Sequence, residues 1–393
     1  MANPSLQIGN SKWAIKEDNE LGYSSSGTRF FPIPITMTRA SAGTRVNPQG
    51  LVETVELLGS EEITNGDFAT DSVWAKAPSG VTISGGSANF NSSSDTYVYQ
   101  DILTATKTYK IIFSGTINSG SLYIGENGVA TNTYTAGTYT NEVAYFTVAS
   151  SSRFIIRKTG VGTLDATINN VSVKEVTRND LARVDYDGTA SSLLVEPQRT
   201  NLIPYSSDFT VGNWAKTRCT VTSNQATSPD GTLNADLMTS TDDDARLGDQ
   251  VGSSGAEFTQ SIYVKSAQVS DVNCQIDFAG LNTVTFTANQ QWQRVETTLT
   301  DTSQSPRLRL RILNSGNSIY VWGGQVEEGS YATSYIPTSG STVTRVQETY
   351  TKTGISNKIN SEEGVLFAEM AVLSDNSTLK SITLSDGTGG NRV

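Results

Sequence analysis

The sequence predicts an all-β protein of tandem antiparallel β-sandwiches, and three observations lead to that prediction. Apolar and polar residues alternate with a period of two in many short segments; in residues 307–313, Arg307, Arg309 and Arg311 alternate with aliphatic side chains. Only 17% of residues are charged, and Ser, Thr and Asn fill the polar positions, which suits the solvent side of a sheet. The alternating segments end at turns rich in Gly, Asn and Pro, and none of helical length keeps a 3.6-residue period.

Two parts of the chain resemble each other and predict an internal repeat. ITNGDFATDSVWAK (63–76) and IPYSSDFTVGNWAK (203–216) both carry Asp-Phe followed by Trp-Ala-Lys. Each opening is followed about a hundred residues later by an alternating segment that ends at an acidic turn, INNVSVKEV (168–176) and YVWGGQVEEGSYATSYIPTSG (320–340). Each unit therefore has the size of a β-sandwich of about eight strands.

The 393 residues can form two or three domains, each with its own core. The two prolines of FFPIPI exclude a helix or a central strand there and indicate an extended N-terminal arm that grips another molecule. Two short alternating strands near the C-terminus indicate a further domain that starts there, or strands that pair with another subunit. The expected divisions are an arm (1–35), a split β connector (36–60 and 178–200), a first sandwich inserted into it (61–177), a second sandwich (201–345), and a linker with the start of a third β domain (346–393).

Composition excludes several functional classes. The chain has no histidine, so Ser-His-Asp and Cys-His nucleophiles and imidazole-held zinc are excluded, and we predict no catalytic residue, metal or cofactor. A glycosidase-type carboxylate pair stays chemically open. The net charge of −11 and the lack of an apolar run of 18 residues argue against nucleic acid and membrane insertion. Cys219 and Cys274 are expected to be free thiols, with a single disulfide as the alternative.

Four aromatic residues are the candidates for binding a ligand, which would be a sugar. Trp74 and Trp214 offer flat indole faces for a pyranose ring, although their equivalent places in the two units favour packing at one end of each sandwich. Tyr97 and Tyr99 in DTYVYQD share one face of a strand and are the better candidates, with cross-strand aromatic packing as the alternative.

Other features have plain structural interpretations. Trp292 and Trp322 have apolar strand neighbours and are expected in the core. The acidic run 242–244 could collect calcium but is interpreted as a solvated loop. The arginines of residues 307–311 would meet an anionic glycan or a neighbouring subunit, or would keep an edge strand soluble.

Several of these motifs carry a family resemblance. NGDF (65–68), SIYVKS (261–266), WQRVETTL (292–299) and the two closing segments resemble jelly-roll carbohydrate-binding modules. TRASAGTRVNPQGLVE (38–53), DYDGTASSLLVEPQRTNLIPYSSDF (185–209) and SYATSYIPTSGSTVTR (330–345) resemble the versions of those modules in bacteriophage tail and head fibres. ITLSDGTGGNRV (382–393) resembles the start of a concanavalin-like lectin domain.

The resemblance implies a non-catalytic subunit of a virion fibre, assembled in the cytoplasm of a bacterial host. It implies a homotrimer that contacts other virion proteins through residues 1–60 and a host-surface glycan through its sandwiches. The alternative is a carbohydrate-active enzyme or one of its glycan-binding modules. The chain departs from the module pattern where an Asp pair often helps to hold calcium, because Asn169 and Asn170 stand there in the first unit and Gly323 and Gly324 in the second. Calcium is therefore not expected.

Overall fold

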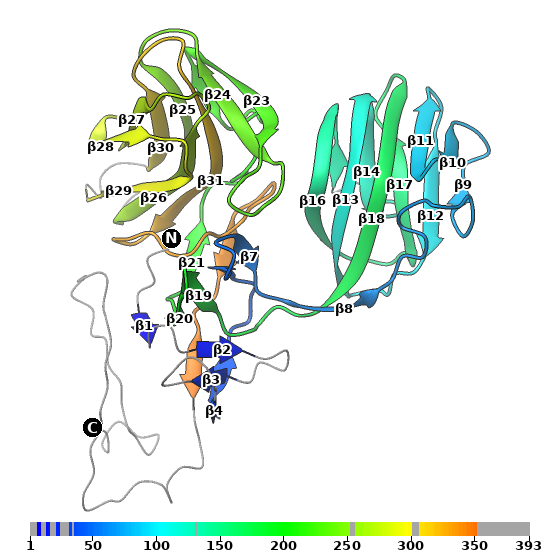
Figure 1. Ribbon diagram of the computed structural model, residues 1–393, viewed down its shortest axis with the longest axis horizontal. Helices are drawn as coiled ribbons and strands as arrows, with labels where there is room; N and C mark the ends of the chain where they lie inside the picture. Colours follow the sequence, from blue (N-terminus) through cyan, green and yellow to red (C-terminus); the bar gives the residue numbers. More distant parts are fainter. Residues whose placement is uncertain are drawn as a thin grey trace, which may run out of the picture.

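The computed structural model describes residues 35–129, 132–251, 256–300 and 306–351, together with four short strands near the N-terminus. Within this part of the chain every paired strand is antiparallel and no helix occurs, which confirms the all-β prediction (Figure 1). It contains no helix long and apolar enough to cross a membrane. The expected lectin-like start, and all of residues 352–393, lie outside the described residues.

The first sandwich is formed by ten strands in two facing sheets, of sheet order β10-β11-β18-β13-β16 and β15-β14-β17-β12-β9. The strand β8 (Leu57–Glu61) adds to the long end of β18. The ten strands are β9 (Ala75–Lys76), β10 (Val81–Ser84), β11 (Ser87–Ser92), β12 (Tyr97–Asp101), β13 (Thr108–Ser119), β14 (Ser121–Glu126), β15 (Thr133–Tyr134), β16 (Gly137–Thr147), β17 (Arg153–Thr159) and β18 (Leu164–Arg178).

The second sandwich repeats this arrangement strand for strand. Its sheets have the orders β23-β24-β31-β26-β29 and β28-β27-β30-β25-β22, so the chain visits the two sheets in the same sequence as in the first sandwich. The internal repeat is confirmed, with ten strands per unit rather than about eight. These strands are β22 (Ala215–Thr217), β23 (Cys219–Ala226), β24 (Ala235–Ser240), β25 (Ala245–Gln250), β26 (Phe258–Ser266), β27 (Val272–Phe278), β28 (Leu281–Ala288), β29 (Gln293–Leu299), β30 (Arg307–Ile312) and β31 (Ser318–Glu328).

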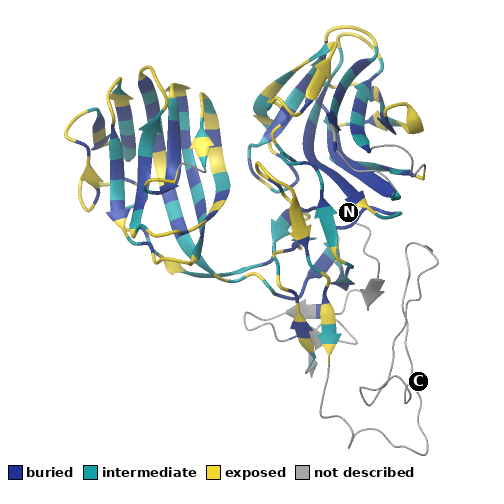
Figure 2. Ribbon diagram, turned by 180° about the vertical axis from the view of Figure 1, so that it is seen from behind, coloured by how far each residue is buried: buried dark blue, intermediate teal, exposed yellow. Residues whose placement is uncertain are grey.

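Alternation along the strands fills each core. In β13 every second residue from Tyr109 to Ile117 is buried while its neighbours are half-exposed, and Figure 2 shows the resulting stripes. In β30, Leu308, Leu310 and Ile312 are fully buried in the second core, as the sequence predicts. The alternative of an edge strand for the arginines on the other side of β30 is wrong, because β30 is the middle strand of its sheet.

The repeated Asp-Phe…Trp-Ala-Lys motif builds the same packed loop in both units. The indole of Trp74 donates a hydrogen bond to the carbonyl of Asn65, and that of Trp214 donates one to the carbonyl of Tyr205, both over 2.9 Å. In the second unit the loop lies against the closing strand β31, where Gly323 has a φ of +66° and a Cβ on Gly324 would sit 3.1 Å from the ring of Trp214. Gly324 is therefore explained by the close approach of the indole, and Gly323 by its positive φ.

The expected split connector acquires a third segment from beyond the second sandwich. Residues 343–351 pair with residues from both of the expected halves. The short strands of this connector are β5 (Thr36–Thr38), β6 (Thr44–Val46), β7 (Val52–Thr54), β19 (Val184–Asp187), β20 (Ala190–Val195), β21 (Arg199–Asn201), β32 (Val343–Arg345) and β33 (Thr349–Thr351).

The N-terminal arm also joins the connector rather than staying separate from it. Trp13 and Leu21 are buried in a small core with Val184 and Leu193. The four strands of the arm are β1 (Leu6–Ile8), which pairs with β20, and β2 (Trp13–Ile15), β3 (Leu21–Tyr23) and β4 (Phe31–Ile33), which form a small sheet of their own.

A buried ionic cluster holds the connector together. Arg183 contacts Glu196 at 2.7 Å and Glu348 at 2.5 Å, Arg39 contacts Glu348 at 2.8 Å, and Arg345 contacts Glu196 at 3.0 Å. All five side chains are at most 1% exposed. Burial acts to raise the pKa of Glu196, but the charges of Arg345 and Arg183 outweigh it and hold that pKa at about 2. The cluster ties the three connector segments into one body.

Candidate carbohydrate-binding face

The two tryptophan candidates are packing residues. Trp74 is 5% exposed and Trp214 is 2% exposed, and each ring contacts the phenylalanine of its own loop, Phe68 or Phe209, at centroid distances of 5.1 and 4.6 Å. A sugar ring needs an accessible indole face, and neither position offers one. The prediction that they bind a sugar is therefore wrong, and the packing alternative is correct.

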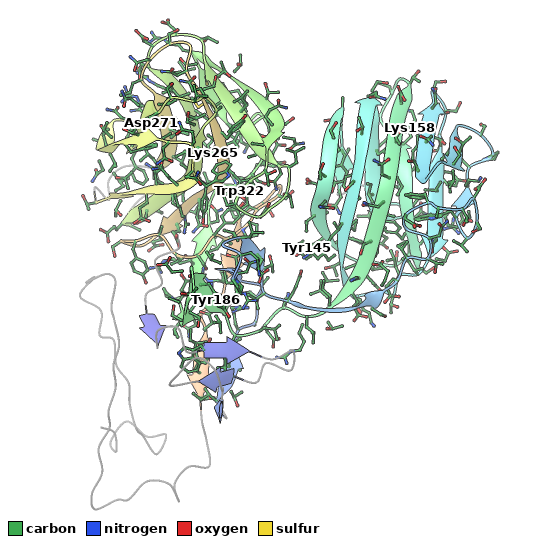
Figure 3. The ribbon with its side chains drawn as sticks, in the orientation of Figure 1. Tyr145, Lys158, Tyr186, Lys265, Asp271 and Trp322 are labelled. Atoms are coloured by element: carbon green, nitrogen blue, oxygen red, sulfur yellow. The ribbon has the colours of Figure 1, made fainter. Side chains whose placement is uncertain are left out.

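Of the other two tryptophans, Trp322 is buried as expected and Trp292 is only partly buried. Both belong to an aromatic cluster on the outer side of the sheet that contains β31, with Tyr263, Tyr335 and the connector residue Val52. Figure 3 places Trp322 at the end of the second sandwich nearest the connector. This cluster covers part of that sheet's outer side at the connector.

Tyr97 and Tyr99 lie on the outer side of β12 and are half-exposed, while Val98 and Gln100 point into the sandwich. Their ring centroids are 6.1 Å apart with an interplanar angle of 43°. The alternative of aromatic packing in the core does not hold, because both rings point away from it. They form a short, tilted aromatic strip on the surface of the first sandwich.

Two arginines from the neighbouring strand β17 lie over this strip. The guanidinium carbon of Arg153 is 3.6 Å from the centroid of the Tyr99 ring, and that of Arg157 is 5.7 Å from the centroid of Tyr97. Arg153 is held by Asp101, whose hydrogen bond raises the pKa of the arginine. These contacts follow from the strand register, which pairs Tyr97 with Arg157 and Asp101 with Arg153.

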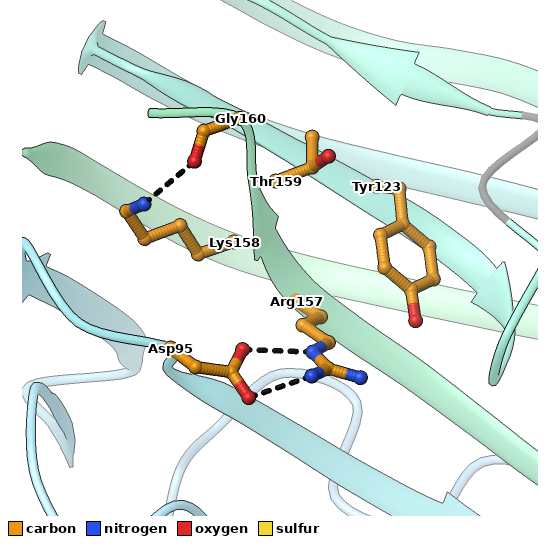
Figure 4. Close-up of a pocket in the computed structure, with 6 residues that line it drawn as sticks. All are labelled: Asp95, Tyr123, Arg157, Lys158, Thr159 and Gly160. Carbon is orange, nitrogen blue, oxygen red and sulfur yellow. Dashed lines mark hydrogen bonds and ion pairs between the residues drawn. The ribbon is translucent and has the colours of Figure 1, made fainter. Parts of the chain in front are cut away.

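A shallow depression of about 440 Å³ adjoins the strip (Figure 4). On its floor Tyr123 of β14 pairs across the sheet with Arg157, which binds Asp95 through two hydrogen bonds of 2.8 and 2.6 Å. Lys158 donates to the carbonyl of Gly160 at the rim. We call the outer side of β12, β17 and β14 the aromatic face.

The aromatic face can bind a polar, ring-shaped ligand. Half-exposed phenols supply flat apolar area, and the guanidinium and carboxylate groups at their edges supply hydrogen-bond donors and acceptors of fixed geometry. The four charged side chains Asp95, Asp101, Arg153 and Arg157 are between 35% and 51% exposed, so they can exchange partners at low cost.

The tyrosines of this face were predicted from the sequence, but its arginines were not. Arg153 and Arg157 stand four apart in RFIIRKTG, and Asp95 and Asp101 flank the tyrosines in DTYVYQD. A strand spacing of two places each of these sets on one side. The missing information was the pairing of two segments more than fifty residues apart.

The other sequence candidates have local roles. Asp244 accepts hydrogen bonds from Arg246 and Arg311, while Asp242 and Asp243 are exposed. Among the described residues no group of three or more His, Cys, Asp or Glu side chains could hold a metal ion. Cys219 and Cys274 are free thiols, and burial raises the pKa of Cys274 to about 12.

Comparison with known proteins gives structural similarities only, since no family model and no curated protein matches the chain. The tandem CBM22-1–CBM22-2 domain of Xyn10C from Paenibacillus barcinonensis is 12% identical over 69% of this chain and 98% of that one, with a TM-score of 0.26. The family 11 carbohydrate-binding module from Clostridium thermocellum, solved with a mixed-linked tetrasaccharide, is 12% identical over 35% and 98%, with a TM-score of 0.26. The tandem CBM51 modules of Sp3GH98 from Streptococcus pneumoniae are 7% identical over 75% and 100%, with a TM-score of 0.22. At these identities and TM-scores the fold class rests on the strand pairing itself.

Proposed function

We propose that this chain is a non-catalytic, glycan-binding subunit of a bacteriophage fibre, in which the first sandwich binds host-surface sugar through its aromatic face. The observation that carries the glycan-binding part is the strip of Tyr97 and Tyr99 with guanidinium and carboxylate groups at its edges. An exposed aromatic strip bordered by hydrogen-bonding groups matches a sugar, which has apolar ring faces and a polar rim.

The fibre part of the proposal rests on the fibre-like motifs and on what they build. TRASAGTRVNPQGLVE, DYDGTASSLLVEPQRTNLIPYSSDF and SYATSYIPTSGSTVTR supply Arg39, Glu196 and Arg345 of the buried ionic cluster. A connector held by buried charges, from which both sandwiches extend, suits a projecting appendage. In the virion, residues 1–60 would contact the particle, and several copies of a weak sugar site would act together.

The experiment measures location, oligomeric state and activity together. We expect the full chain to be a trimer by light scattering, to label on intact particles with a specific antibody in electron microscopy, and to release no reducing sugar from polysaccharides. A monomer that is absent from particles but binds polysaccharide would instead support the alternative, a glycan-binding module of a carbohydrate-active enzyme. Release of reducing sugar would overturn the non-catalytic assignment.

A further inference from the structure

The second sandwich carries a counterpart of the aromatic face, and strand register identifies it residue by residue. In the first unit Ala75 pairs with Tyr99, and in the second Ala215, from the same Trp-Ala-Lys motif, pairs with Gly248. Tyr99 therefore corresponds to Gly248, and two residues earlier in each strand Tyr97 corresponds to Arg246. Because the sheets have the same strand order, the outer side of β25, β30 and β27 is the equivalent surface. We call it the arginine face.

One ion pair is retained at the same place in both faces. Arg157, the cross-strand partner of Tyr97, binds Asp95, which stands two residues before that tyrosine. Arg311, the cross-strand partner of Arg246, binds Asp244, which again stands two residues earlier, at 2.7 and 2.5 Å. The retained pair confirms the correspondence independently of the sequence motif.

Around this pair the chemistry differs between the two faces. In the second unit Arg246 stands in the place of Tyr97, and Gly248 in the place of Tyr99. Arg309 stands in the place of the apolar Ile155. Gln275 takes the place of Tyr123. The outer positions of the three strands hold four guanidiniums and one carboxylate, that of Asp277, and Asp244 adds a second carboxylate just before β25. The net charge of the face is therefore 4 − 2 = +2, although the whole chain has a net charge of −11. The four guanidiniums belong to Arg246, Arg307, Arg309 and Arg311.

Arg309 is placed to bind an anion. Its Nε donates to the buried carboxylate of Asp277 at 2.6 Å, and Asp277 is also held by the backbone N–H of Gly280. The terminal amino groups of Arg309 have no hydrogen-bond partner among the described residues, and 16% of its side chain is exposed. Gly280, with a φ of +103°, has no side chain, so the space beside one of these amino groups is open. A Cβ on Gly280 would lie 3.4 Å from that group. A guanidinium fixed through Nε presents its remaining fork to a planar or tetrahedral anion without further ordering.

We propose that the arginine face is a second carbohydrate site, specific for the carboxylate or sulfate of an acidic polysaccharide, with Arg309 as its principal anion contact. This inference rests on the proposed glycan-binding function. It assigns different chemistry to the two units, since the aromatic face takes uncharged rings and the arginine face takes acidic ones. A polysaccharide with both kinds of residue would bind the two sandwiches of one chain.

The test compares oligogalacturonate with its methyl ester, and sulfated with unsulfated dextran, by titration calorimetry on the full chain. We expect the acidic member of at least one pair to bind ten times more tightly or better, and Arg309→Gln to lose that preference. Arg218→Gln is the matched control, because Arg218 is an exposed arginine outside the face whose loss changes the net charge equally. It should alter acidic binding by less than twofold and keep the wild-type melting temperature. Arg309→Gln takes a partner from the buried Asp277 carboxylate and should lower the melting temperature, so binding is measured at a temperature where both variants are folded.

Each outcome decides the inference. Equal binding of acidic and neutral members, equal effects of the two arginine variants, or binding of inorganic sulfate and phosphate without any polysaccharide would overturn it. Tyr97→Ala/Tyr99→Ala separates it from the proposed function. If the double tyrosine variant loses only the binding of neutral glycans, the arginine face stays supported. If the wild-type chain binds acidic glycans but no neutral glycan, the aromatic face is overturned as a binding site and the arginine face is still supported.

Discussion

The guanidinium of Arg153 covers one face of the Tyr99 ring at 3.6 Å and is itself held by Asp101 at 2.9 Å. A sugar bound there, as proposed, would contact the guanidinium edge together with the ring. This arrangement joins a flat apolar surface to a charged donor within one short stretch of β12 and β17.

Replacing Arg153 separates binding from stability. Because its ion pair and ring contact are on the surface, Arg153→Ala should lower the free energy of unfolding by less than about 1 kcal/mol. Loss of the guanidinium donors should weaken glycan binding by roughly ten- to a hundredfold, since charge-assisted hydrogen bonds contribute about 1.5–3 kcal/mol. Urea unfolding and calorimetry on the same protein measure both quantities. A variant that binds as tightly as the wild type would remove Arg153 from the site.

The close approach of Trp214 to β31 predicts that Gly324→Ala destabilises the second sandwich. A Cβ at this position would lie 3.1 Å from the indole, so the ring must move, at a cost of about 1–3 kcal/mol. Gly212→Ala is the control, because its Cβ would meet nothing within 4 Å and its φ is not positive. Thermal unfolding with tryptophan fluorescence follows the change. Equal melting temperatures for the two variants would refute the packing role of Gly324.

Breaking the ionic cluster should destabilise the connector strongly. Arg183→Met leaves Glu196 and Glu348 buried with fewer partners, which costs about 3–5 kcal/mol. The pKa of Glu196 is lowered to about 2, so its contribution is complete above about pH 4.5 and is lost as pH falls toward 2. We therefore expect the wild type to lose stability over this acidic range, and Glu196→Gln to lose less there. Urea midpoints measured from pH 2 to pH 6 test this, and parallel curves for both proteins would contradict it.

Asp236 gives the opposite pH dependence in the second sandwich. Burial raises its pKa to about 7, although the backbone N–H groups of Phe209 and Asn224 donate to it. The folded state then keeps a proton that the unfolded state has lost, so stability falls as pH rises from about 4 to about 7. Asp236→Asn should lower stability overall. It should also flatten this slope, removing a change in the free energy of unfolding on the order of 2–4 kcal/mol between about pH 4 and about pH 7. An unchanged slope in urea unfolding would show that Asp236 does not titrate there.

Much of the fold was predictable because its signals are local. The period of two in β13 and β30 predicted which of their residues are buried. The repeated Trp-Ala-Lys motif predicted where the second unit begins. The closing segments were found for the same reason, since a strand carries its alternation in its own sequence.

The parts that sequence analysis missed depend on pairing between distant segments. Arg183 looks like a surface residue in ARVDYD, yet it is fully buried because Glu196 and Glu348 reach it from two other segments. Trp74 and Trp214 offered two interpretations in the sequence, and only their burial decided between them. Likewise, the ion pair of Arg157 with Asp95 joins residues 62 positions apart.

Binding of a panel of neutral and acidic glycans by the full chain tests the aromatic face most directly. The wild type and Trp74→Phe, whose indole is buried away from the surface, should bind the same glycans with similar affinity. Tyr97→Ala/Tyr99→Ala should lose binding of neutral glycans by tenfold or more while it keeps the wild-type melting temperature. Full binding by the double tyrosine variant, or loss of binding in Trp74→Phe alone, would contradict a carbohydrate site on this surface.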